Sequence, residues 1–114
     1  MAYNEKLATR VREALAELPK VEEKEKMGGL VFMLDDKFCV KVHNDDLLCR
    51  IDPTVYEDAL EQKGCREWIY NGKPMKGWVM VGAESTKSKK DLDYWMQLVI
   101  SFNSKAKSSK KKKK

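Results

Sequence analysis

The stretch GLVFMLDDKFCVKVHNDDLLCRI, residues 29–51, decides the fold of this chain. Its apolar and β-branched runs are separated by short clusters of Asp and Asn, which is the pattern of consecutive β-hairpins. We therefore expect three antiparallel strands here. In the second strand Phe38, Val40 and Val42 alternate with Lys or Cys, so we expect these three to share the apolar face of a sheet with one covered side.

The segments before this meander predict a helix, followed by a segment that is either a strand or a loop. Apolar residues at helical spacing indicate an amphipathic helix over residues 4–18, with Asn4 as its N-cap and Pro19 as its stop. Residues 20–26, KVEEKEK, are strongly polar and fit either an exposed edge strand or a loop. Charges of this density would discourage another strand from pairing with such an edge.

The segments after the meander predict two more helices and two more strands. Asp52 is a good N-cap, Pro53 fits the first helical position and Gly64 fits the position after a helix, so we expect a helix over residues 52–64. We also expect strands at residues 65–70 and 77–81. A last helix is expected at residues 88–103, where Ser88 and Asp91 make a start like that of a capping box.

This order of elements, α-β-β-β-β-α-β-β-α, predicts an α+β domain. Its antiparallel sheet would have five to six strands, with helices at the N-terminus, in the middle and at the C-terminus. The chain of 114 residues is long enough for one such domain with one core. We expect this domain to span residues 1–104.

The basic character of the chain is concentrated at its C-terminal end. Seven of the 23 Lys and Arg residues and none of the 18 acidic ones lie in residues 105–114, which leaves residues 1–104 with a net charge of −2. A segment almost without apolar groups cannot offset its ordering entropy, so we expect a disordered tail. The tail lysines are Lys105, Lys107, Lys110, Lys111, Lys112, Lys113 and Lys114. They could attract nucleic acid weakly and without sequence preference.

Two features of the sequence bear on its compartment. No apolar run approaches the roughly 18 residues that a membrane span needs, and the start MAYNEKLATR lacks the apolar region of a signal peptide. Cys39, Cys49 and Cys65 are odd in number and widely spaced, which favours reduced thiols over a disulfide framework. We expect a cytoplasmic protein without membrane association.

Candidates for catalysis and metal binding are few. His43 is the single histidine, and the motifs of hydrolase nucleophiles and zinc proteases are absent. Cys39, His43 and Cys49 could join Asp45 and Asp46 around a metal, yet the closely spaced cysteine pairs of a structural zinc site are missing. We expect no catalytic centre, no metal and no cofactor.

The stretch NGKPMKGWVMV, residues 71–81, invites comparison with a ligand site. Its first two residues tolerate positive φ and predict a reverse turn, and Pro74 cannot donate to a β-ladder, so it belongs in a loop or at a sheet edge. A turn, a connector and a strand account for the stretch without a ligand. We expect Met75 and Trp78 to be core or cover residues.

Three separated blocks resemble the N-terminal domain of the TfoX/Sxy family. They are EKMGGLVFMLDDKFCVKV (25–42), DDLLCRIDPTVYEDAL (45–60) and NGKPMKGWVMV (71–81). The positions that match the family motifs are Met27, Gly28, Gly29, Arg50, Asp52, Pro53, Pro74, Met75, Lys76, Gly77 and Trp78. The sequence lacks a Phe often found after the Met, and Asp36 replaces the usual turn glycine. We expect the matching positions to be structural.

The resemblance implies a curved antiparallel sheet, similar to secretion-chaperone-like domains, and a homodimer. Full TfoX regulators of bacterial competence carry a second, C-terminal domain, where this sequence has the lysine-rich segment, so the competence role is not carried over. The resemblance implies a small non-enzymatic binding or regulatory module that acts through protein contacts. The alternative is a non-specific nucleic-acid-associated protein that uses the lysine tail.

Overall fold

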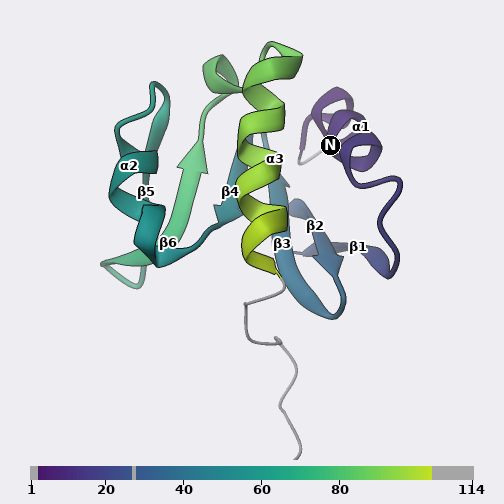
Figure 1. Cartoon of the computed structure of the whole chain (residues 1–114), viewed down its shortest axis with the longest axis horizontal. Helices are drawn as coiled ribbons and strands as arrows, with labels where there is room; N and C mark the ends of the chain where they lie inside the picture. The colour runs from purple at the N-terminus through teal and green to yellow at the C-terminus, as the bar shows by residue number, and fades with distance from the viewer. Residues whose placement is uncertain (1–2, 27, 104–114) are drawn as a thin grey trace, which may run out of the picture.

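One antiparallel sheet forms the centre of the molecule (Figure 1). The computed structural model describes residues 3–26 and 28–103, and among these residues six strands pair in the order β1-β2-β3-β4-β6-β5. The strands are β1 (Val21–Lys26), β2 (Gly29–Leu34), β3 (Lys37–His43), β4 (Asp46–Arg50), β5 (Cys65–Tyr70) and β6 (Lys73–Val81). The helices are α1 (Glu5–Ala14), α2 (Tyr56–Leu60) and α3 (Lys89–Asn103), and the short 3-10 turns η1 (Pro53–Val55) and η2 (Ala83–Ser85) precede α2 and α3. The predicted α+β class and element order are confirmed.

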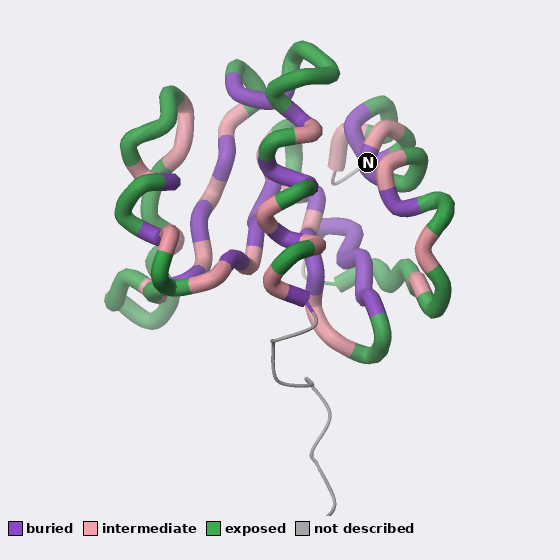
Figure 2. Tube along the Cα trace, viewed as in Figure 1, coloured by how far each residue is buried: buried purple, intermediate pink, exposed green. Residues whose placement is uncertain are grey.

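The helices pack on the same face of the sheet and share one hydrophobic core with it (Figures 1 and 2). Trp95 of α3 is among the largest fully buried side chains and is 2% exposed. The buried core residues of the helices are Leu7, Ala8, Val11, Tyr56, Ala59, Leu92, Trp95, Met96 and Val99, and those of the strands include Phe32, Val40, Val42, Leu47, Cys49, Val79 and Val81. None of the helices in the described part of the chain has the length and apolar character of a membrane span.

The predicted caps of α1 and α3 are confirmed. The side chain of Asn4 accepts the backbone N–H groups of Lys6 and Leu7 at 2.9 and 3.1 Å, and the Ser88 hydroxyl accepts the backbone N–H of Asp91 at 3.0 Å. These contacts satisfy donors that have no partner inside a helix.

The first helix is shorter than predicted. Regular helix ends at Ala14, and residues 15–18 continue as turns, with the backbone N–H of Leu18 donating to the Leu15 carbonyl at 3.0 Å. The ring of Pro19 would clash with the carbonyl four residues earlier, that of Leu15, if the helix ran on.

Residues 21–26 form an edge strand rather than a loop. Strand β1 pairs with β2 along its whole length, from Val21 opposite Leu34 to Lys26 opposite Gly29. Five of its six residues carry a charge, which fits a strand whose outer side lies at the edge of a sheet.

The last strand begins earlier than predicted. Asn71 and Gly72 form the expected turn, with φ of 54° and 79°, but β6 starts directly after it at Lys73. Pro74 pairs opposite Ile69 of β5, in a part of β6 that has no pairing with β4. A proline is tolerated there because one side of the strand is free.

The face predicted for Phe38 is wrong, and a β-bulge is the reason. Met33 pairs with Phe38 and Phe32 pairs with Val40, so Cys39 is an extra residue in β3. Cys39 and Val40 both belong to the core. Because a bulge shifts the alternation of side chains by one residue, Phe38 turns to the opposite face of the sheet, against Trp78.

Candidate functional site

The face of the sheet away from the helices holds a cavity of about 300 Å³. Its lining comes from every strand of the sheet: Lys26 (β1), Val31 and Met33 (β2), Phe38 and Lys41 (β3), Leu48 (β4), Trp68 and Tyr70 (β5) and Trp78 (β6). Strands β1 and β5 lie at opposite ends of the strand order, so their meeting at one cavity means that the sheet curves around it. We call this surface the aromatic trough.

The floor of the trough is apolar and buried although none of the described helices covers it. Val31 is 5% exposed, Leu48 4% and Met33 9%. Strand β2 is therefore buried on both of its faces, as its unbroken colour in Figure 2 indicates. A second cavity of about 80 Å³ extends the trough along Lys41, His43, Leu48, Trp68 and Met80.

Four aromatic rings form a continuous row along the trough. The ring centroids of Tyr70 and Trp68 are 5.3 Å apart, those of Trp68 and Trp78 5.3 Å, and those of Trp78 and Phe38 4.8 Å. Such separations are typical of favourable aromatic pairs. Tyr70 stands at the outer end of the row and is 47% exposed. The row thus begins at a solvent-accessible ring on β5 and ends at the half-buried ring of Phe38 on β3.

Cations surround this row. The Lys26 and Lys41 side chains line the cavity, and the guanidinium carbon of Arg50 lies 5.2 Å from the Trp78 ring centroid and 5.8 Å from that of Phe102. Partial burial lowers the pKa of Lys41 and of Arg50, because a less hydrated site disfavours the charged form. Arg50 gains a cation–π contact in exchange for part of its hydration.

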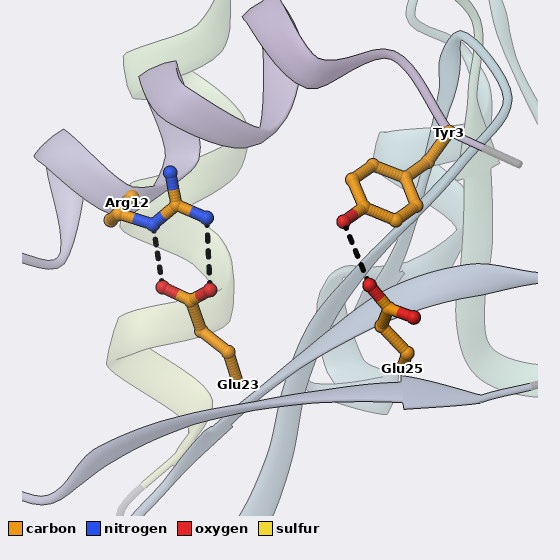
Figure 3. Close-up of polar contacts among 4 residues, drawn as sticks. All are labelled: Tyr3, Arg12, Glu23 and Glu25. Carbon is orange, nitrogen blue, oxygen red and sulfur yellow. Dashed lines mark hydrogen bonds and ion pairs between the residues drawn. The ribbon is translucent and has the colours of Figure 1, made fainter. Parts of the chain in front are cut away.

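Strand β1 turns two of its carboxylates away from the trough (Figure 3). The Arg12 guanidinium donates to Glu23 at 2.6 and 2.9 Å, and the Tyr3 hydroxyl donates to Glu25 at 3.2 Å. The hydrogen bond from Arg12 lowers the pKa of Glu23. Side chains alternate between the two faces of a strand, so Lys26 lies on the face opposite these acids.

The balance of charge at the trough is positive among the described residues. No carboxylate lines the cavity there. Glu22 shares the face of Lys26 and lies opposite Met33 of the trough floor, but Lys24 lies on the same face, opposite Val31. The nearby Asp46 carboxylate is held by Arg66 at 2.8 Å. An apolar floor, an aromatic row and cationic sides can hold a flat or extended ligand that carries negative charge.

Two other cavities lie on the helical side and lack these features. One of about 320 Å³ lies between η2, the segment after α2, and the start of α3, and one of about 390 Å³ lies between α1 and α3. Both are lined by side chains of mixed charge, among them Lys90 and Asp91 in the first and Glu13 and Lys89 in the second. The first is lined by one contacting ring pair, Tyr94 and Trp95, with centroids 4.8 Å apart, and the lining of the second among the described residues includes no aromatic ring.

The glycines of the first family motif shape the start of β2. Gly28 has a φ of 78°, which L side chains rarely adopt. A Cβ at Gly29 would lie 2.5 Å from the Val42 carbonyl oxygen, so only glycine allows β2 to approach β3 this closely. Met27 of the same motif lies outside the described residues.

The other two motif blocks meet at the end of β4. The Asp52 side chain accepts the Thr54 backbone N–H at 2.9 Å, and Pro53 begins η1. Gly77, with a φ of 91°, accepts the Ile51 backbone N–H at 2.8 Å, and a Cβ there would lie 3.5 Å from the Pro53 ring. These contacts join the segment after β4 to β6.

The residues that line the trough differ, apart from Trp78, from the site residues singled out in the sequence. Pro74 and Lys76 are exposed and Met75 is half-buried, while Trp78 is a cover residue on the trough face and not part of the helix-side core. Sequence reasoning missed the participation of Lys26, Phe38, Lys41, Trp68 and Tyr70. The two-residue spacing of Trp68 and Tyr70, which places both on one face of a strand, was a usable signal.

The remaining candidate residues do not converge on a reactive centre. Cys39 and Cys49 are buried, and burial raises the pKa of Cys39 to about 12 and that of Cys65 to about 11. No group of three or more His, Cys, Asp or Glu residues within 3–26 and 28–103 is placed to hold a metal ion. The seven tail lysines lie outside the described residues.

These observations define a small α+β domain whose single antiparallel sheet has one helix-covered face and one open, aromatic face. Residues 13–103 match the family model of the TfoX N-terminal domain. The chain belongs to this family, as the three sequence blocks indicated. Neither a curated protein nor a solved structure matches the chain significantly.

Proposed function

We propose that this chain is a non-enzymatic binding module of the TfoX N-terminal type that holds its ligand in the aromatic trough. The observation that carries the proposal is the open face of the sheet, where four rings in contact and several cations surround an apolar floor. Membership of the TfoX N-terminal domain family supports a binding or regulatory role. Sheet faces that serve only as surface normally carry polar residues.

The state of the nucleophile candidates supports a non-enzymatic role. Burial raises the pKa values of Cys39 and Cys49, which keeps these thiols protonated at neutral pH, and a protonated thiol is a poor nucleophile. Among the described residues the buried Nδ1 atom of His43 has no hydrogen-bond partner, whereas a catalytic base is commonly oriented by a third group.

Selection from two random pools tests this proposal. A peptide display library and a pool of single-stranded oligonucleotides would each be selected against the wild-type full chain and against the variant Tyr70→Ala. The matched control is Tyr94→Ala, because Tyr94 is exposed to a similar extent, 40% against 47%, but lies on α3. We expect enrichment from at least one pool on wild type and Tyr94→Ala, and loss of it on Tyr70→Ala. No enrichment from either pool, or enrichment that survives Tyr70→Ala, would refute it.

A second candidate function rests on the distribution of charge. Residues 105–114 carry seven lysines and no acid, whereas residues 1–104 carry a net charge of −2. Non-specific attraction of a polyanion would then belong to the tail, and the affinity for duplex DNA would fall with salt with a logarithmic slope no steeper than about −6. Titration of duplex DNA at two salt concentrations, with and without residues 105–114, distinguishes this candidate.

A further inference from the structure

We propose that the aromatic trough binds a single strand of nucleic acid, with bases stacked on the Tyr70–Trp68 end of the row and phosphates beside Lys26 and Lys41. This inference rests on the proposed function, because it names the ligand class for the same surface.

The geometry of the row suits bases. Tyr70 and Trp68 are stacked with an interplanar angle of 30°, and the exposed ring of Tyr70 ends the stack. A base can extend such a stack whatever its identity, because every base has a π-face. Trp78 already carries the Arg50 guanidinium at 5.2 Å, so the open end of the row lies on β5.

The placement of charge suits phosphates. Lys26 and Lys41 line the trough from β1 and β3, and Lys73 pairs directly opposite Tyr70 at the open end of the row. Glu23 and Glu25, which could repel a phosphate, face α1 and Tyr3 instead (Figure 3).

The curvature favours a single strand over a duplex. The bases of a duplex are stacked inside it, and a concave surface lined by rings from β5, β6 and β3 cannot reach them. A single strand exposes its bases and can follow a groove. The net charge of −2 over residues 1–104 fits a local site of this kind better than a broad phosphate-binding face.

Intrinsic tryptophan fluorescence tests the proposal on the full chain. Trp68 and Trp78 line the trough, whereas Trp95 is buried in the core, so stacked bases should quench the first two and spare the third. The probes are a twelve-nucleotide oligothymidine, the corresponding duplex and a glutamate-rich peptide. We expect saturable quenching by the single strand and much weaker quenching by the duplex.

Matched variants locate the site. Tyr70→Ala should weaken binding roughly tenfold, as for loss of one base–aromatic stack, and Tyr70→Phe should retain the affinity because it keeps the ring. Lys26→Glu should weaken binding by several-fold. The controls Tyr94→Ala and Lys6→Glu, at exposed positions on α3 and α1, should bind like wild type. Circular dichroism confirms that each variant is folded.

Four outcomes would overturn the proposal. Single-strand binding without quenching, unaffected by Tyr70→Ala, would assign binding to the lysine tail. Binding of the glutamate-rich peptide but not of the oligonucleotide would keep the trough as a binding site and replace its ligand. Light scattering could show that the wild-type chain is a dimer and that Tyr70→Ala is a monomer. The trough would then be covered by a second copy of the chain and not by nucleic acid. If neither probe binds and both random pools fail, the proposed function fails with it.

Discussion

At the scale of single residues, the face of the sheet on which a tryptophan lies decides how much stability its replacement by alanine removes. Trp95 is fully buried in the helix-side core, whereas Trp78 is half-buried in the trough. We expect Trp95→Ala to lower the free energy of unfolding by roughly 3–5 kcal/mol, Trp78→Ala to cost clearly less, and Lys76→Ala to stay within about 0.5 kcal/mol. Urea denaturation measures all three. Equal losses for the two tryptophans would mean that the trough is packed as tightly as the core.

The ion pair between Arg12 and Glu23 gives a prediction about pH. The pKa of Glu23 is lowered from 4.5 by the hydrogen bond from Arg12, so the ionised carboxylate stabilises the folded state above about that pH and the contribution is lost as the pH falls through the lowered pKa. The side chains are 49% and 34% exposed, so screening keeps the contribution below about 1 kcal/mol.

The variant Glu23→Gln tests this sign. We expect it to unfold at a lower temperature than wild type at pH 7, and the difference should shrink at acidic pH, as the pH falls through the lowered pKa of Glu23 and the wild-type carboxylate takes up a proton. Glu22→Gln, on the other face of β1, is the control and should change little at either pH. A difference that grows on acidification would contradict the assignment.

At the scale of elements, the β2–β3 hairpin depends on Gly29 more than on an ordinary glycine. A Cβ there would lie 2.5 Å from the Val42 carbonyl and 2.6 Å from the Lys41 side chain, so Gly29→Ala must separate the two strands. We expect a loss of roughly 1–3 kcal/mol, typical of overpacking. At Gly72 no atom of the described residues lies within 4 Å of an added Cβ, and Gly72→Ala should cost only the strain of positive φ, about 1–2 kcal/mol. Thermal unfolding compares them. A Gly72→Ala loss larger than that of Gly29→Ala would refute the steric argument.

The sequence predicted those elements whose signals are local. The caps at Asn4 and Ser88 and the turn at Asn71 depend only on neighbouring residues, so propensity was sufficient. The bulge at Cys39 depends on how β3 pairs with β2, and simple alternation therefore placed Phe38 on the wrong face. The trough depends on curvature and on β4 pairing with β6, which is not its neighbour in sequence, and no local pattern encodes that.

At the scale of the whole molecule, the domain should not need its lysine-rich end. The last helix ends against the sheet at Asn103, which is 5% exposed. The Asn103 carbonyl accepts a hydrogen bond from the Lys37 ammonium of β3 at 3.2 Å. We expect a chain that ends at residue 104 to melt within a few degrees of the full chain, since the segment removed holds no large apolar group. Calorimetry measures this. A larger drop would show that the tail docks on the acidic body.

The two edges of the sheet differ, and this limits how copies of the chain can polymerise. At the β1 edge five of six residues carry a charge, which discourages an added strand. The β5 edge ends in Ile69 and Tyr70, which are 52% and 47% exposed. We therefore expect a strand of another molecule to add at the β5 edge rather than at the β1 edge. If two copies joined through β5, each would have its charged β1 strand at the outer edge of the shared sheet. The assembly would then close as a two-fold pair and could not extend into a fibre.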